Sequence, residues 1–215
     1  MEVLLCAATR LEIDPTIQYL ASQNIKNIDI LVTGVGLIAA TYHITKAVYQ
    51  KRPQLILQAG IAGALDTNLK LGSVVIIESE TIGDLGVMEQ GSFRSLFDMK
   101  FLQENDAPWT NATLLNATGI LDELLLPRVK GVSINEITTL PSRIEQYKDT
   151  MGASVESMEG AALHYVGLME NIPFLQVRSL SNFVGERDKS KWQIKEAIEN
   201  LNKELIPIIS KFVRL

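Results

Sequence analysis

The sequence predicts an α/β protein in which helices flank a central sheet. Three observations indicate this class: short apolar segments rich in Val, Ile and Leu recur along the chain, helical patterns fall between most of them, and the last helical pattern carries one continuous apolar stripe. Short apolar runs of this kind are typical of strands in a sheet that is covered on both faces.

Six segments are predicted to be strands because each is short, apolar and enriched in Val, Ile and Leu. They span 2–8, 28–33, 54–60, 73–78, 129–135 and 174–181.

Helices are predicted between these strands from their start signals and their periodicity. Asp14 and Pro15 supply a cap and a first-turn proline for a helix to about residue 22. Two further helices are expected from Gly36 to about residue 49 and from Met158 to about residue 170. The last helix has an apolar stripe at steps of three or four, which faces the sheet: Ile194, Ile198, Leu201, Leu205, Ile208 and Phe212.

The stretch from 82 to 126 lacks a steady period. It contains Phe93, Phe97, Phe101 and Trp109. Aromatic residues spaced by fours favour core packing on a helix, although a place in a subunit interface or a pocket wall is also open.

Composition favours a single domain over residues 1–215 and a small soluble substrate. The 215 residues are 47% hydrophobic and 21% charged, enough for one sizeable core. The net charge of −5 argues against a nucleic-acid partner, because such proteins concentrate positive charge. Cys6 is the only cysteine, which favours a reducing cytoplasm, and no apolar run approaches the ~18 residues of a membrane helix.

Glu12 follows the first predicted strand and is expected at its carboxyl end, where open α/β sheets bind their ligands. There it could accept a proton from an attacking water. Position alone equally allows a solvated acid in the first turn of a helix.

Two glycine-containing turns also follow strands, at 33–36 and 60–63. Neither completes a dinucleotide-binding fingerprint, since no third glycine follows Gly36 at the required spacing. Both still allow backbone N–H groups to approach a ligand, because glycine lacks a Cβ.

Glu159 lies at the expected amino terminus of a helix that begins with small residues. The helix dipole favours its ionised form, which can accept hydrogen bonds from two vicinal hydroxyls. A simple capping role is the alternative. Downstream, Asn182 offers both a donor and an acceptor to a ligand, or else caps the turn into Gly185, and Arg178 could form a structural ion pair.

These motifs, Ser157-Met158-Glu159-Gly160-Ala161-Ala162, Arg178-Ser179-Leu180-Ser181-Asn182 and Glu12, resemble the nucleoside phosphorylase and nucleosidase superfamily. The segment from Asn182 to Trp192 is similar to that of the futalosine hydrolase family, a relative of the methylthioadenosine/adenosylhomocysteine nucleosidases. The resemblance implies a mixed central sheet, a small-molecule nucleoside substrate, no cofactor and a homodimer or larger homo-oligomer.

The resemblance also implies roles for individual residues. Glu12 would activate water, and Met158 and Glu159 would hold the ribose. Gly60 and Ile61 would border the reaction centre, with Arg178 near the water.

Asn182 stands where adenosine-type relatives carry an aspartate. An amide can donate to the 6-oxo group or to nitrogen 7 and accept from a ring N–H, so a 6-oxopurine such as hypoxanthine is expected. Ser157 departs from the family pattern, in which an acid precedes the methionine.

Gln58 and Ile61 favour hydrolysis over phosphorolysis. Phosphorylases of the superfamily typically hold an arginine and a serine at these positions, and neither Gln58 nor Ile61 offers phosphate a charge-assisted donor. Ile61 also replaces the serine that holds the water in many nucleosidases.

The expected reaction is therefore the hydrolysis of futalosine to hypoxanthine and dehypoxanthine futalosine in menaquinone biosynthesis. Arg187 or Arg10 could neutralise the benzoate of futalosine, although a surface salt bridge is the commoner fate of such an arginine. His43 and His164 have no second ligand at metal-binding spacing, so no metal is expected. A purine nucleoside phosphorylase, an adenosine-type nucleosidase and a non-catalytic nucleoside-binding module remain alternatives.

Overall fold

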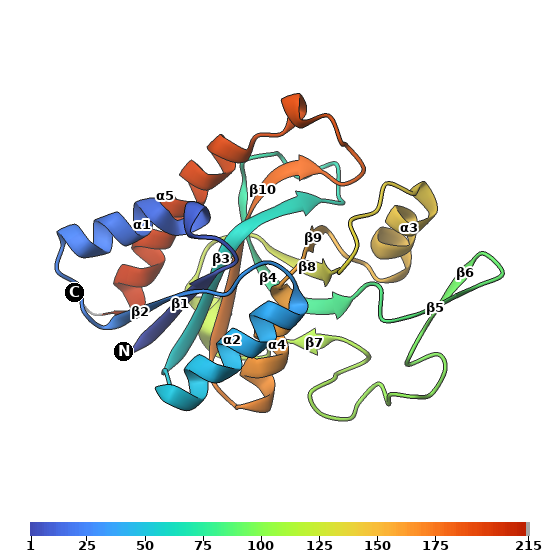
Figure 1. Ribbon diagram of the computed structural model, residues 1–215, viewed down its shortest axis with the longest axis horizontal. Helices are drawn as coiled ribbons and strands as arrows, with labels where there is room; N and C mark the ends of the chain where they lie inside the picture. Colours follow the sequence, from blue (N-terminus) through green and yellow to red (C-terminus); the bar gives the residue numbers. More distant parts are fainter. Residues whose placement is uncertain (214–215) are drawn as a thin grey trace.

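The computed structural model describes residues 1–213 and confirms the α/β class (Figure 1). The strands are β1 (Val3–Ala7), β2 (Ile28–Val32), β3 (Leu55–Ala64), β4 (Val74–Ile82), β5 (Gly86–Glu89), β6 (Ser92–Ser95), β7 (Leu114–Leu115), β8 (Arg128–Ser133), β9 (Val155–Ser157) and β10 (Phe174–Phe183). The helices are α1 (Arg10–Ser22), α2 (Leu37–Gln50), α3 (Pro141–Glu145), α4 (Gly160–Met169) and α5 (Ile194–Phe212). Shorter turns of helix are η1 (Gly119–Glu123), η2 (Gln146–Thr150) and η3 (Lys189–Lys191).

The central sheet is mixed, as the resemblance implied. β1 runs parallel to β2 and β3, and β10 runs parallel to β3. β4 is antiparallel to β10, and β9 is antiparallel to β3. The carboxyl ends of β1, β3 and β10 therefore lie at the same edge of the sheet.

β3 is the central strand of the molecule. Its first half pairs with β1, its second half pairs with β9, and β10 runs along its other side. Because β10 pairs with β4, β4 with β8 and β8 with β9, the strands β3, β10, β4, β8 and β9 form a closed ring. Small and aliphatic side chains from these strands pack together inside the ring, including Ala62, Ala64, Val75, Ile77, Val155 and Leu180.

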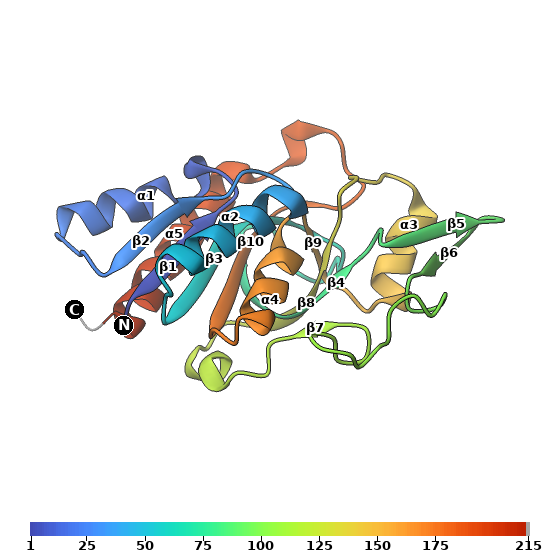
Figure 2. The same ribbon diagram turned by 60° about the horizontal axis from the view of Figure 1, so that its bottom comes forward.

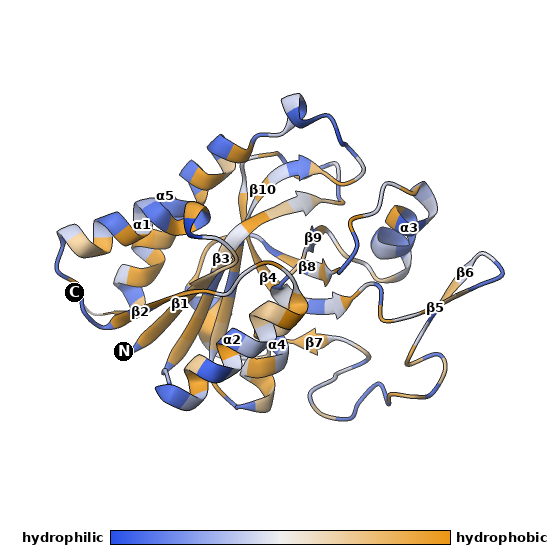
Figure 3. Cartoon of the chain, in the orientation of Figure 1, coloured by the Kyte–Doolittle hydropathy of each residue, from blue (hydrophilic) through white to orange (hydrophobic). Residues whose placement is uncertain are grey.

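Two pairs of helices cover the two faces of the sheet (Figures 1 and 2). Val3 and Leu5 of β1 pack in a cluster with α1 and α5, whereas Leu4 and Cys6 pack with α2 and α4. This alternation follows from the two-residue period of a strand. In Figure 3 the strands β1 and β3 are largely hydrophobic and the outward sides of the helices are polar.

Helix α1 begins earlier than the sequence predicted. It starts at Arg10 instead of near Asp14, and Pro15 lies inside it. Oε2 of Glu12 accepts hydrogen bonds from the Thr9 N–H and the Thr9 hydroxyl, both at 2.9 Å. A side chain that reaches back to the N-cap in this way satisfies an unpaired donor and fixes the start of the helix.

The stretch from 82 to 126 holds no helix of the predicted kind. β5 and β6 form a hairpin that projects from the body of the molecule (Figure 2). Its two-residue turn has positive φ at Gln90 (50°) and Gly91 (82°), as tight hairpins require. Phe97 is buried against Trp109, with ring centroids 5.0 Å apart, but Phe101 is 75% exposed. The spacing by fours was therefore misleading there.

Within residues 1–213, no helix has the length and apolar character needed to cross a bilayer.

Candidate active site

The carboxyl ends of β1, β3 and β10 bring three buried charged side chains together. Glu12 lies just after β1, Arg178 lies on β10, and Glu159 immediately precedes α4. Their exposed fractions are 8%, 1% and 5%. Charged groups are rarely buried this deeply unless they are paired, so the cluster is a candidate for function as well as for structure.

Glu12 is held rigidly by its neighbours. Oε1 accepts a hydrogen bond from the Ile61 N–H at 3.0 Å, while Oε2 is held by Thr9. The backbone carbonyl of Glu12 accepts from the Asn202 side chain at 2.9 Å. Glu12 does lie in the first turn of a helix, but the alternative of a solvated acid there is wrong because the side chain is buried.

Arg178 links the groups around it. One of its nitrogens, Nη2, lies 3.7 Å from Oε2 of Glu159 and donates to Oε1 of Gln58 at 3.0 Å. The other, Nη1, donates to the Ile61 carbonyl at 3.4 Å. Arg178 therefore forms the ion pair that the sequence left as an alternative, and the partner in that pair is another predicted site residue.

Gly60 is where these side chains crowd against β3. A Cβ at Gly60 would lie 2.5 Å from Nη1 of Arg178 and 2.8 Å from Oε1 of Glu12. Both distances are shorter than real Cβ contacts allow, so only glycine lets the two side chains approach this strand.

Glu159 contacts the first glycine turn instead of its own helix. Its Oε1 accepts from the Gly36 N–H at 3.0 Å, and it makes no side-chain hydrogen bond that caps α4. The simple capping role is therefore wrong. The contact joins two segments that are far apart in sequence, and the glycine turn was the only sequence signal for it.

Asn182 lies at the end of β10, where it pairs with Gly63 of β3. Its Nδ2 donates to the Phe183 carbonyl at 3.0 Å, and its Oδ1 accepts from the Ser181 hydroxyl at 2.9 Å. Gly63 is three residues beyond Gly60, which is about 10 Å along a strand. Asn182 thus lies along the same strand end as the charged cluster, without contacting it.

The other predicted residues divide into two groups. Ile61 supplies the N–H that holds Glu12, and the partly buried Met158 packs near β8 and η2. Arg10 and Arg187 stay on the surface: Arg10 pairs with Asp14 at 2.9 Å, and Arg187 lies over the Trp192 ring at 5.6 Å. The structure does not bring either arginine to the charged cluster.

A second buried polar group was missed by sequence reasoning. Glu80 accepts hydrogen bonds from Ser133 and Gln176, both at 2.9 Å, and Ser133 in turn accepts from the Ala161 N–H at the start of α4. Burial raises the pKa of Glu80 to about 7. His164 lies next to Gln176, and burial lowers its pKa to about 4. The only signal was an acid within the strongly apolar segment that forms β4.

Among residues 1–213, no three His, Cys, Asp or Glu side chains are grouped so that they could hold a metal ion. A cavity of about 510 Å³ lies between the β5–β6 hairpin and α3, lined by residues such as Phe93, Trp109 and Arg143. None of the predicted site residues lines it, so it is separate from the charged cluster.

The chain is similar in sequence to several known nucleosidases. The chain is 28% identical to a futalosine hydrolase of Thermus thermophilus over 84% of the chain and 80% of the relative, and 29% identical to one of Streptomyces coelicolor over 86% and 80%. It is 25% identical to a 5'-methylthioadenosine/S-adenosylhomocysteine nucleosidase of Tolumonas auensis over 85% and 82%.

A solved structure of a Helicobacter pylori futalosine hydrolase has the same fold, with a TM-score of 0.80, 16% identity and 97% of each chain covered. The model of one family, described as the phosphorylase superfamily, matches residues 19–214. This match covers most of the sequence, and the chain belongs to the phosphorylase superfamily.

Proposed function

We propose that this protein hydrolyses the N-glycosidic bond of a 6-oxopurine nucleoside, with futalosine as substrate and with hypoxanthine and dehypoxanthine futalosine as products. The observation that carries the proposal is the convergence of Glu12 and Arg178 on Gly60, with Glu159 paired to Arg178 and Asn182 farther along the same strand end. The relatives named futalosine hydrolase support the substrate. The reaction would be a step of menaquinone biosynthesis.

Glu12 is proposed as the general base. Each of its carboxylate oxygens is fixed by a backbone N–H, from Ile61 or from Thr9. A carboxylate oxygen retains a further lone pair after one such bond, so Glu12 can still accept the proton of an attacking water. Because its position is set before the substrate arrives, little reorganisation is needed in the reaction.

Glu159 is proposed to hold the ribose, together with Met158. Its Oε1 is oriented by Gly36, and Oε2 faces Arg178. Both oxygens have capacity left for the 2′ and 3′ hydroxyls of a sugar. Two buried carboxylates, Glu12 and Glu159, would also stabilise the positive charge that develops on the sugar as the bond to the base breaks.

Hydrolysis is proposed over phosphorolysis because of what surrounds Gly60. Gln58 donates to the Glu159 carbonyl and accepts from Arg178, so its amide is already occupied. Ile61 offers an N–H that Glu12 already takes. Arg178 is compensated by Glu159, which leaves no uncompensated cation there to attract a phosphate dianion.

The decisive experiment measures purine release from futalosine, inosine and methylthioadenosine in phosphate-free buffer, with and without added phosphate. We expect hypoxanthine from futalosine with no dependence on phosphate. A strict need for phosphate would indicate a phosphorylase, adenine from methylthioadenosine alone would indicate the activity named for the Tolumonas relative, and binding without turnover would indicate a binding module.

Replacement of Glu12 tests the proposed base. Glu12→Gln keeps the shape of the side chain and removes its basicity, so we expect kcat to fall on the order of 10²–10⁴-fold while hypoxanthine still binds. Steady-state kinetics and calorimetric titration measure the two quantities. Glu2→Gln, at an exposed acid, is the matched control. Unchanged kcat in Glu12→Gln would exclude Glu12 as the base.

A further inference from the structure

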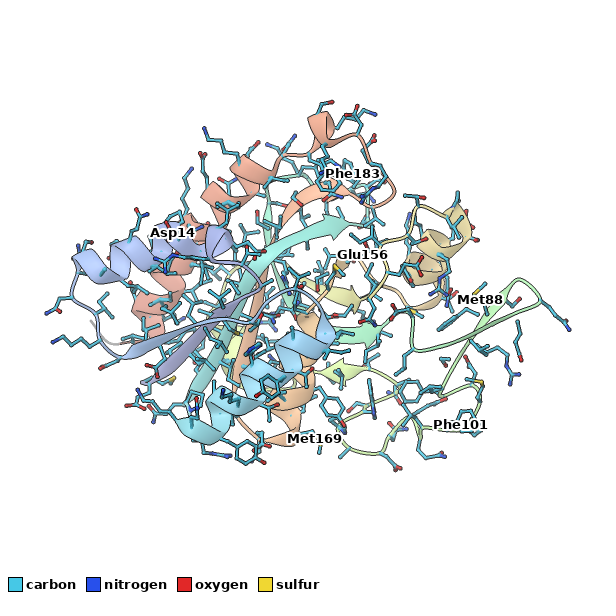
Figure 4. All side chains as sticks on the ribbon, viewed as in Figure 1. Asp14, Met88, Phe101, Glu156, Met169 and Phe183 are labelled. Atoms are coloured by element: carbon cyan, nitrogen blue, oxygen red, sulfur yellow. The ribbon has the colours of Figure 1, made fainter. Side chains whose placement is uncertain are left out.

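A buried acid on β4 packs against the amino terminus of α4. Glu80 pairs with Gly131 of β8, and its carboxyl group lies against Gly131 and against Gly160, the first residue of α4. A Cβ at Gly160 would overlap Oε1 of Glu80, and a Cβ at Gly131 would lie 2.6 Å from the same atom. Both glycines are therefore needed for the acid to lie here. Figure 4 labels Glu156 on β9, which leads into α4, and Met169 at the other end of α4.

The two hydrogen-bond partners of Glu80 are neutral groups. Ser133 donates to Oε2 and Gln176 donates to Oε1, both at 2.9 Å, and the acid is 1% exposed. Two charged groups act on it: Arg178 on β10, which already pairs with Glu159, and Glu159 itself, whose negative charge opposes a second one. A buried charge without a partner of its own is costly, so these surroundings favour the protonated acid.

Two other buried atoms at this place lack a hydrogen-bond partner among residues 1–213. They are Oε1 of Gln176 and Nε2 of the neighbouring His164. Nδ1 of His164 lies 2.9 Å from the Leu114 carbonyl, which can only accept, so Nδ1 carries the ring hydrogen and Nε2 is an acceptor. Burial keeps the ring neutral, because it lowers the pKa of His164 to about 4. Two acceptors, one on each side chain, therefore lack a donor.

One proton on Glu80 supplies both missing donors. The two ends of a glutamine amide have the same shape, and a half-turn of the Gln176 amide exchanges them. Its nitrogen then donates to Nε2 of His164, and its oxygen accepts the carboxyl proton of Glu80. Ser133 donates to the other oxygen of Glu80 and accepts from the Ala161 N–H at 2.8 Å. Every group then donates to the next in one chain from α4 to β7, and hydrogen bonds in such a chain strengthen one another.

We propose that Glu80 is a positioning residue that works as a neutral acid: its proton completes this hydrogen-bond chain, which fixes the amino terminus of α4 and with it Glu159. Glu159 directly precedes α4, and Ala161, two residues later, is held by the chain. An ionised Glu80 would place a second negative charge near Glu159 and would compete with it for Arg178. The effect on the ribose rests on the proposed function, whereas the proton on Glu80 does not.

Infrared spectroscopy tests the proton directly. Below about pH 7 the wild type should contain one more protonated carboxyl group than Glu80→Gln, and the corresponding band of the wild type should disappear at higher pH. Glu156→Gln is the matched control, because burial also raises the pKa of Glu156 to about 7, and this variant should keep the Glu80 band. Identical carboxyl absorption of the wild type and Glu80→Gln would overturn the proposal.

The kinetics of purine release test the positioning. Glu80→Leu has no polar group at this place, and we expect kcat/KM to fall about 10²-fold, as for a displacement of about 1 Å. Glu80→Gln, which can donate to Gln176 and accept from Ser133 as the neutral acid does, should rescue most of that loss. It should also lack the decline in kcat/KM that ionisation of Glu80 causes in the wild type above about pH 7.

Two kinetic results would overturn the proposal. One is full activity of Glu80→Leu. The other is a decline at high pH that is equal in the wild type and in Glu80→Gln, and this comparison does not need Glu80→Leu to fold. Because infrared absorption does not depend on turnover, a protein that carries the proton on Glu80 but fails to hydrolyse futalosine would refute only the proposed function.

Discussion

At the scale of single residues, the site depends on glycine, which has no side chain, as much as on its charged residues. Gly60 has no side chain, and this allows Arg178 and Glu12 to lie against β3 from two directions. Gly63, three residues farther along β3, leaves room in the same way for Val184, whose Cγ2 would lie 2.9 Å from a Cβ there. The polar side chains therefore pack against a central strand whose glycines leave room for them, and not against long flexible loops. This packing favours a fixed geometry.

Gly60→Ala is expected to displace Glu12 and Arg178, because the new methyl would lie 2.5–2.8 Å from atoms of both. Misplacement of a catalytic group by about 1 Å can reduce the rate about 10²-fold, so kcat/KM for purine release should fall by that order. Gly119→Ala is the matched control, since nothing lies within 4 Å of a Cβ there. Equal activity of the two variants would contradict the proposed crowding at Gly60.

At the scale of secondary-structure elements, helix α5 holds α1 in place through one buried amide. Asn202 of α5 is 4% exposed; its Oδ1 accepts from the Thr16 N–H at 3.0 Å, and its Nδ2 donates to the Glu12 carbonyl at 2.9 Å. The terminal helix, far from the site in sequence, thus fixes the first turn of the helix that carries Glu12.

Asn202→Ala should remove the two buried side-chain hydrogen bonds, to the Thr16 N–H and to the Glu12 carbonyl, that join α5 to α1. We expect a loss of roughly 1–3 kcal/mol in the free energy of unfolding, measured by urea denaturation, and a lower kcat as the first turn of α1 loosens. Asn200→Ala is the control on the same helix, because the Asn200 side chain donates only to the Gly72 carbonyl. A drop in kcat of the same size in both variants would show that Asn202 has no special influence on Glu12.

At the scale of the whole molecule, buried ionisable groups make stability depend on pH in opposite directions. Burial raises the pKa of Glu80 from 4.5 to about 7, so between these values the folded chain keeps a proton that the unfolded chain loses. Stability from this group therefore falls as pH rises from 4.5 to 7. Burial lowers the pKa of His164 from 6.5 to about 4, and its effect has the reverse sign: stability is lost as pH falls through that range.

Glu80→Gln isolates the first effect, because glutamine can keep the contacts with Gln176 and Ser133 without ionising. Relative to the wild type, the variant should gain up to about 3 kcal/mol in unfolding free energy between pH 4.5 and 7.5. Urea denaturation at several pH values measures the difference. Glu196→Gln, at an exposed acid, is the control: its unfolding free energy should differ from that of the wild type by the same amount at every pH. A constant offset for Glu80→Gln as well would mean that Glu80 is ionised in the folded protein throughout this range.

The local chemistry of the sequence determined most of the elements and most of the named side chains. Apolar segments predicted the strands that include β1, β3 and β10, since a strand covered on both faces needs a short apolar run. The motif around Glu159 and the loop that holds Glu12 predicted the charged residues, because their resemblance to a known superfamily lies in the residues themselves. The interpretation of the aromatic residues was right only in part: Phe97 and Trp109 are buried, whereas Phe101 is exposed. No helix forms there, and Phe93 lies in the β5–β6 hairpin.

The tertiary structure alone decided which of these groups meet. Gly36 binding Glu159, Arg178 pairing with Glu159, and Asn202 holding Glu12 are contacts between residues more than 18 positions apart, and no local pattern encodes them. Strand register decided the place of Glu80 as well, since pairing with Gly131 of β8 puts its carboxyl group against the start of α4. A sequence specifies what each strand can bury, whereas the pairing of strands determines which polar groups face one another across the sheet.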